Sequence, residues 1–123
     1  STIVTYCNTT HMALEAAEKL QEELNMSVEV IDIRSLIPLD TETIVASVKK
    51  TNKVLVVHED KIFSGFGAEI AAQISDAAFE YLDGPVMRVG STFTPVGFNR
   101  ILEAAILPNT EKIYESLKKL AEY

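Results

Sequence analysis

The stretch that decides the fold is Lys53-Val54-Leu55-Val56-Val57-His58, a continuous apolar run that ends in a histidine. A short apolar run without alternation, rich in β-branched residues, is typical of a central parallel strand covered on both faces. Parallel strands need long crossover connections, so helices are expected on either side of this strand in the sequence. Residues 54–57 therefore predict a sheet between two helical layers.

The rest of the chain continues the same alternation of strands and helices. Strands are predicted where β-branched residues gather, at residues 3–7, 28–33, 54–57 and 86–89. Helices are predicted from apolar residues spaced three and four apart, at residues 10–24, 41–50 and 68–82, in a short segment around 101–105, and from residue 110 onward. The pattern predicts an α/β fold, a three-layer α/β/α sandwich with a mainly parallel sheet.

Local signals mark several helix ends. Asp40 is placed to cap the second helix, and Lys49 and Lys50 lie in its last turn, where cations suit the helix dipole. In the third helix, Ala71 and Ala72 widen the apolar surface, so this helix is expected to be deeply buried.

Composition limits the function classes. The 123 residues suit one domain, residues 1–123, and the net charge of −7 argues against binding to nucleic acid. No apolar run is long enough to cross a bilayer. The single cysteine, Cys7, excludes an internal disulfide, fits a cytoplasmic location and is expected to be a small core residue. Because a strand begins almost at Ser1, we expect the chain to be a fragment of a longer subunit.

The most suggestive local feature is His58-Glu59-Asp60 at the end of the central strand, followed by Gly65 and Gly67. Ligands bind beyond the carboxyl ends of strands in open α/β sheets, so a histidine there could act as a general base. The glycines could instead bind an anion through backbone N–H groups. Against this, Glu69 in the first turn of the following helix would repel a phosphate. A tight turn at a helix start is therefore the preferred interpretation.

Arg88 and His11 are two further residues with chemical potential. Arg88 is a charge on a strand, and a structural ion pair with Glu69 or Glu59 is expected to compensate it. His11 has no second histidine or cysteine at ligand spacing, so no metal site is expected.

Several motifs together carry a family resemblance. Residues 32–40 (DIRSLIPLD) are similar to the DLRTLxPLD segment of the transketolase C-terminal domain family. Residues 47–51 (SVKKT) and 54–59 (VLVVHE) resemble its SVxKTxRxxVVxE stretch. Residues 65–69 (GFGAE) and 79–88 (FEYLDGPVMR) particularly resemble beta subunits of thiamine-diphosphate-dependent 2-oxo acid dehydrogenases, and the resemblance covers essentially the whole chain.

The resemblance implies a role within a larger enzyme. The family enzyme decarboxylates a 2-oxo acid, pyruvate or a branched-chain acid, and passes the acyl group to a dihydrolipoyl acyltransferase. Thiamine diphosphate and Mg are bound by other domains of the alpha and beta parts, so no catalytic or cofactor-binding residue is expected here. The domain supports the dimer and lies where the basic subunit-binding domain of the acyltransferase docks, with Glu122 and Tyr123 near that contact. His58, Glu59, Gly65, Gly67, Glu69 and Arg88 are then structural residues.

Some alternatives stay open. The family sheet has five strands, one of them antiparallel, and the strand not found here is expected before Ser1. Residues 90–98 depart from the family pattern, which has an aspartate and several prolines at this place. The subfamily and its substrate therefore stay open. A single chain that fuses the alpha and beta parts is a further alternative. A free-standing nucleotide- or anion-binding module, and membership of the transketolases or 1-deoxyxylulose-phosphate synthases, are the competing hypotheses.

Overall fold

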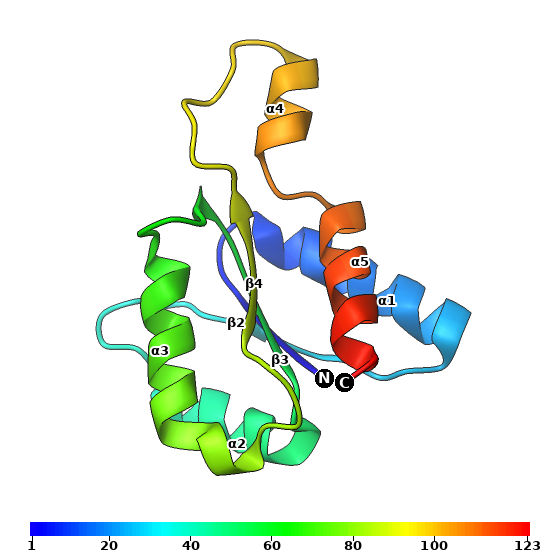
Figure 1. Ribbon diagram of the computed structural model, residues 1–123, viewed down its shortest axis with the longest axis vertical. Coiled ribbons are helices and arrows are strands. Elements are labelled where there is room, and N and C mark those ends of the chain that lie inside the picture. The colour runs from blue at the N-terminus through cyan, green and yellow to red at the C-terminus, as the bar shows by residue number, and fades with distance from the viewer.

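The computed structural model describes all residues, 1–123, as alternating strands and helices (Figure 1). The elements are β1 (Thr2–Thr5), α1 (Thr9–Leu24), β2 (Glu29–Asp32), α2 (Thr41–Thr51), β3 (Val54–Lys61), α3 (Phe66–Ala78), the 3-10 helix η1 (Phe79–Tyr81), β4 (Met87–Ser91), α4 (Arg100–Ile106) and α5 (Thr110–Ala121).

The four strands form one sheet in the order β2-β1-β3-β4, and every neighbouring pair is parallel. β3 lies between β1 and β4, and Val54, Leu55, Val56 and Val57 are all fully buried, as the apolar run predicts. An irregularity in the β3–β4 pairing falls between Val57 and Lys61. A fifth, antiparallel strand is not among residues 1–123, and its position before Ser1 stays a prediction.

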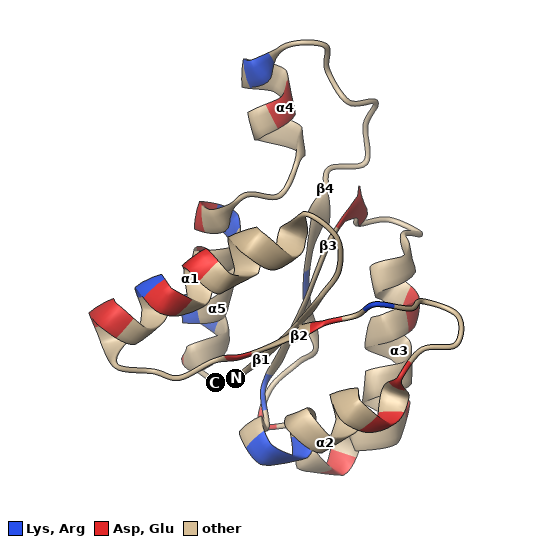
Figure 2. Cartoon of the chain, turned by 180° about the vertical axis from the view of Figure 1, so that it is seen from behind, with Lys and Arg blue, Asp and Glu red and all other residues tan.

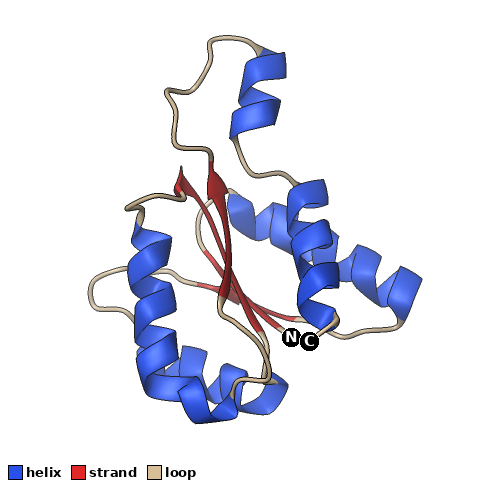
Figure 3. Cartoon of the chain, in the orientation of Figure 1, coloured by secondary structure: helices blue, strands red, loops and turns tan.

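Helices cover both faces of the sheet, so the predicted three-layer α/β/α fold is confirmed (Figure 3). Alternate residues of each strand point to opposite faces. On one face, Ile3, Leu55 and Val57 pack with α1 and α5. On the other face, Val4 and Val56 pack with α2 and α3. Two separate hydrophobic cores result, one on each side of the sheet.

Capping side chains fix where several helices begin. The backbone N–H of Thr43 donates to Oδ1 of Asp40 over 3.1 Å at the start of α2, as predicted. Asn99 and Asn109 accept the equivalent hydrogen bonds at the starts of α4 and α5. Each satisfies a backbone donor that has no partner within its own helix.

The third helix differs from its prediction. It begins two residues earlier, at Phe66, and ends at Ala78, where a 3-10 turn replaces its last turn. Ala72 is exposed although Ala71 is buried, so the expectation of a deeply buried helix was wrong. Small side chains on the outer face of a helix look apolar in a sequence, but they do not require burial.

Cys7 was also predicted wrongly. The first strand ends at Thr5, and Cys7 lies in the turn before α1 with a positive φ of 57°. Its side chain is exposed, so it is not part of either core. The backbone N–H of Thr10 donates to the Cys7 carbonyl over 3.2 Å, which holds the turn.

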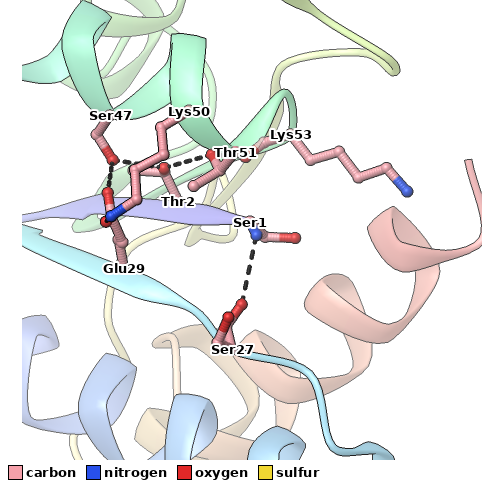
Figure 4. Close-up of polar contacts among 8 residues, drawn as sticks. All are labelled: Ser1, Thr2, Ser27, Glu29, Ser47, Lys50, Thr51 and Lys53. Carbon is pink, nitrogen blue, oxygen red and sulfur yellow. Dashed lines mark hydrogen bonds and ion pairs between the residues drawn. The ribbon is translucent and has the colours of Figure 1, made fainter.

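A polar network ties β1, β2 and α2 together at the amino ends of the strands (Figure 4). The hydroxyl of Thr2 is 2.7 Å from those of both Ser47 and Thr51. Ser47 also donates to the Glu29 carboxylate, which forms an ion pair with Lys50. Because each buried hydroxyl here has a partner, the network is a structural joint between strands and helix.

Residues 92–107, called the arm below, leave the body of the molecule beyond the carboxyl ends of β3 and β4 (Figure 1). The arm consists of an irregular segment followed by α4, and none of its residues is buried. The predicted helical segment is therefore confirmed, but it packs on neither core. No helix of the structure has the length and apolar character needed to span a membrane.

Candidate functional site

The candidate site lies at the carboxyl end of β3, where the imidazole of His58 is fully buried. Glycines surround this ring. A Cβ atom added to Gly67 would lie 2.0 Å from Cδ2 of His58, and one added to Gly90 would lie 2.8 Å from Cε1. A Cβ on Gly65 would lie 3.2 Å from the same Cε1 and 2.1 Å from the Lys61 carbonyl oxygen. The absence of side chains at these three positions makes room for the histidine.

Neither ring nitrogen of His58 makes a well-formed hydrogen bond within the protein, although the backbone of Asp60 lies close enough to favour the protonated ring. Burial lowers the pKa of His58 below its ordinary value of 6.5; the charge of Asp60 opposes this shift, and that of Arg88 adds to it. A general base must reach the proton that it removes. A fully buried ring cannot do so, and we therefore interpret His58 as a packing residue.

Neither carboxylate that follows His58 hydrogen-bonds to its ring through the side chain, although the charge of Asp60 acts on it. Glu59 and Asp60 are exposed, whereas His58 is buried. The backbone carbonyl of Glu59 accepts a hydrogen bond from Ser91 Oγ, which links β3 to β4. Oδ1 of Asp60 accepts a hydrogen bond from the backbone N–H of Lys61 over 2.7 Å. Adjacency in sequence therefore does not produce an acid–base pair here.

The glycine segment forms a tight turn into α3, as the preferred interpretation states. Gly65 is the N-cap residue of α3, with extended backbone angles, and Gly67 lies in the first turn. The side chain of Glu69 in that turn accepts a hydrogen bond from Gln73 over 2.9 Å. Close packing against His58 accounts for Gly67 without any bound anion.

The expected ion pair of Arg88 is absent. Arg88 forms no salt bridge with Glu59 or Glu69; instead, its Nη1 donates to the Ile62 carbonyl over 3.0 Å. Its side chain is exposed because β4 is an edge strand. The expectation was wrong because it treated a charge on a strand as a buried charge.

Glu122 and Tyr123 lie at the opposite end of the molecule, beside the N-terminus (Figure 1). Both residues are exposed, and Tyr123 is close enough to Gly84 that a Cβ there would lie 3.1 Å from the Tyr123 Cβ. Lys53 Nζ donates to the Ala121 carbonyl over 3.1 Å and fixes the end of α5. Both residues thus lie on the surface of the domain.

Sequence reasoning missed two features. Gly90 contacts the same histidine as Gly65 and Gly67, but it belongs to β4 and no local motif links it to them. The exposure of the arm's apolar side chains was not predicted: Phe98 was placed in an irregular stretch and Ile101 in a short helical segment. The absence of any charge in residues 90–99 was the available signal.

The fold and the glycine-packed strand end define the class of the protein. A family model described as "Transketolase, C-terminal domain" matches residues 1–113. The chain therefore belongs to the transketolase C-terminal domain family.

Its curated relatives are more specific. It is 43% identical over 122 residues to "Pyruvate dehydrogenase E1 component subunit beta" of Rickettsia felis, a match that covers 99% of this chain and 37% of that protein. The protein of the same name from Bacillus subtilis is 38% identical, and the match covers 98% of this chain and 37% of that protein. The mitochondrial beta subunit from Saccharomyces cerevisiae is 43% identical, and the match covers 96% of this chain and 32% of that protein.

A solved structure supports the same fold. The protein titled "Split gene transketolase, inactive beta4 tetramer" superposes with a TM-score of 0.81 at 28% sequence identity, covering 97% of this chain and 37% of that one. The chain spans about a third of the length of these relatives. It is a transketolase-like C-terminal domain whose homologues are pyruvate dehydrogenase E1 beta subunits.

Proposed function

We propose that this chain is the non-catalytic assembly domain of a beta subunit in the first component of a 2-oxo acid dehydrogenase complex. The observation that carries the proposal is the enclosed ring of His58. Open α/β sheets bind ligands at the carboxyl ends of their strands. Here the histidine at that position is fully buried against glycines. The chemistry of the parent enzyme, decarboxylation of pyruvate or a related 2-oxo acid, is assigned to its other domains.

The residues present do not fit thiamine diphosphate and Mg. A magnesium ion needs oxygen ligands that converge on one point, together with phosphate oxygens. The structure contains no group of three His, Cys, Asp or Glu side chains that could hold a metal ion. The first turn of α3, where a diphosphate would meet backbone N–H groups, carries the acidic Glu69. We therefore assign both cofactors to other domains of the alpha and beta parts.

The docking partner that we propose is the basic subunit-binding domain of a dihydrolipoyl acyltransferase. Acidic side chains outnumber basic ones along α1, which carries Glu15, Glu18, Glu22 and Glu23 beside Lys19 (Figure 2). Opposite charge speeds the encounter of two proteins. Tyr123, exposed at the end of α5, offers an aromatic contact of the kind that is frequent in interfaces.

The docking proposal is tested by titrating the chain with an acyltransferase subunit-binding domain in a calorimeter. We expect saturable binding that weakens as salt rises, because screening removes the charge attraction. Deletion of Glu122 and Tyr123 should weaken it about tenfold or more, whereas Phe79→Ser, at another exposed aromatic, should not. Binding unaffected by the deletion would remove the terminal pair from the interface, and no binding at all would contradict the docking role.

The competing hypotheses find less support. A nucleotide- or anion-binding module would use the Gly65–Gly67 turn, but Gly67 is packed against His58. Membership of the transketolases has less support, because the chain is only 28% identical to the transketolase of known structure. It is 38–43% identical to the beta-subunit relatives. The cytoplasmic location stays a prediction, because relatives named as mitochondrial also occur.

A further inference from the structure

The arm, residues 92–107, has few means of holding its own shape. Its helix α4 has only 7 residues and packs on neither hydrophobic core. Isolated helices shorter than about 12–15 residues are marginal in water. The last carbonyl groups of a helix also have no hydrogen-bond partner within it. Contacts from outside α4 must therefore fix its shape and direction.

The ammonium group of Lys112, in the first turn of α5, supplies most of these contacts. It donates to the carbonyls of Ala104, Ala105 and Leu107 over 3.3, 2.8 and 2.7 Å. A lysine ammonium has three N–H donors. No acidic side chain forms an ion pair with it. All the donors of this side chain are thus directed at the end of α4.

The remaining carbonyl at this helix end, that of Ile106, accepts a hydrogen bond from the backbone N–H of Thr92 over 3.0 Å. This bond closes the base of the arm. The irregular segment is held separately, by Lys61 Nζ, which donates to the Thr94 carbonyl over 2.6 Å. Three of the last four carbonyls of the arm therefore depend on a single side chain, Lys112.

Lys112 is placed against the dipole of its own helix. The N-terminus of a helix carries partial positive charge and disfavours a cation, whereas the C-terminus carries partial negative charge and favours one. The charge of Lys112 thus conflicts with the start of α5 and fits the end of α4. A residue that breaks a local rule and gains a contact elsewhere points to a role between the two elements.

The start of α5 is a firm anchor for this side chain. Ile113 and Tyr114, which follow Lys112, are 0% and 3% exposed. The backbone N–H of Lys112 donates to Oδ1 of Asn109, the N-cap residue of α5, over 2.9 Å. The hydroxyl of Thr110 donates to the Glu15 carboxylate of α1 over 2.7 Å. Lys112 therefore joins an element of the body to the projecting α4 (Figure 1).

The direction of α4 decides where the arm places its apolar side chains. Phe98 and Ile101 are 105% and 83% exposed, and the body of the domain does not cover them. A surface that is already ordered loses less entropy when it binds. Fixing α4 in one direction thus keeps these side chains in one place.

We propose that Lys112 is the positioning residue of the arm, and that its ammonium group holds α4 at one angle to α5. Loss of this group frees α4 to move about Leu107 and Pro108, while both cores stay intact. This inference goes beyond the proposed function and does not rest on it.

Hydrogen exchange of the 123-residue chain, followed by mass spectrometry, tests the role of the ammonium group. Lys112→Met keeps a long side chain without its donors, and we expect the amides of α4 to exchange about tenfold faster or more. Lys112→Arg retains charge and donors and should keep most of the protection. Lys118→Met, at an exposed lysine in the last turn of α5, is the matched control and should change nothing.

Three results would overturn the proposal. The first is exchange in α4 that is no faster in Lys112→Met than in the wild type. The second is faster exchange in β1 and β3 as well, because that would show a general loss of stability. The third is a Lys112→Arg variant as poorly protected as Lys112→Met, because the cation would then not be the cause.

Electron paramagnetic resonance measures the direction of the arm itself. Spin labels are attached at the exposed positions of Glu22→Cys in α1 and Glu103→Cys in α4, in a Cys7→Ser background. Dilution with unlabelled chain restricts the measurement to distances within one molecule. We expect a narrow distance distribution with Lys112 and a broad one with Lys112→Met.

A broad distribution in the chain that keeps Lys112, or a narrow one in Lys112→Met, would contradict the positioning role. Neither measurement involves an acyltransferase. The proposed function is therefore judged separately, by its own titration.

Discussion

His58 is the residue whose position suggests a catalytic role but whose burial indicates a structural one. It lies where a ligand-binding histidine would lie, at the carboxyl end of a central strand. Three glycines from α3, its preceding turn and β4 enclose it. The residue thus joins the start of α3 to the sheet, and its buried ring nitrogens make it sensitive to protonation.

Acid should destabilise the protein through His58. Because the pKa of His58 is lowered in the folded state, the unfolded chain binds more protons, and the free energy of unfolding should fall as pH drops below about 6.5. Two carboxylates also have lowered pKa values: Glu29, through its hydrogen bond with Lys50, and Asp40, through its hydrogen bonds with Thr43. They affect stability only at lower pH, below about 4.5. Urea denaturation between pH 5 and 7.5 measures the fall.

The variant His58→Leu isolates this effect. Leucine is similar in size to histidine and has no polar atoms. It therefore avoids the cost of an unpaired buried polar group, about 1–3 kcal/mol. We expect its stability at pH 7.5 to equal or exceed that of the wild type, and the decline between pH 6.5 and 5 to disappear. His11→Leu, at the exposed second histidine, should retain the decline. A decline that persists in His58→Leu would show that another group is responsible.

For single residues, the sequence predicted the place along strands and turns better than the burial and the neighbours of each side chain. It placed His58 at a strand end and Gly65 in a turn. It could not identify Gly90 as a neighbour, because that contact depends on the pairing of β3 with β4. The errors at Cys7 and Arg88 share one cause: a strand pattern does not reveal where the strand stops or which strand forms the edge.

Among the elements, α2 is the one whose start depends most plainly on a single side chain. Asp40 accepts hydrogen bonds from both the backbone N–H and the hydroxyl of Thr43, over 3.1 and 2.7 Å. Asp40→Ala should lower the free energy of unfolding by about 1 kcal/mol, the usual value of such a cap. Asp76→Ala, on the exposed side of α3, is the matched control and should change it by less than about 0.5 kcal/mol. Equal effects of the two variants would refute the capping role.

The elements themselves were largely predictable. Continuous apolar runs marked the strands, and three- and four-residue spacing marked the helices, so the order of elements along the chain is confirmed. The arm was not predictable as an exposed element. Ile101 and Leu102 have the composition of a buried helix, and only the tertiary structure shows that α4 packs on neither core.

The chain forms an α/β domain that resembles one part of a larger enzyme. It has two hydrophobic cores, one on each face of its sheet. Its relatives are about three times as long, and their names place them in the E1 component of pyruvate dehydrogenase. Motifs spread over the whole sequence pointed to this family, whereas the local His58–Gly67 segment alone suggested several functions.

Titration of the isolated chain with thiamine diphosphate and Mg in a calorimeter tests the central claim most directly. We expect no heat beyond dilution, because His58 is enclosed and no cluster of side chains can hold the metal. Circular dichroism of the same sample should show a folded α/β protein. Saturable binding with micromolar affinity, about −8 kcal/mol, would contradict the claim that the cofactor is bound by other domains.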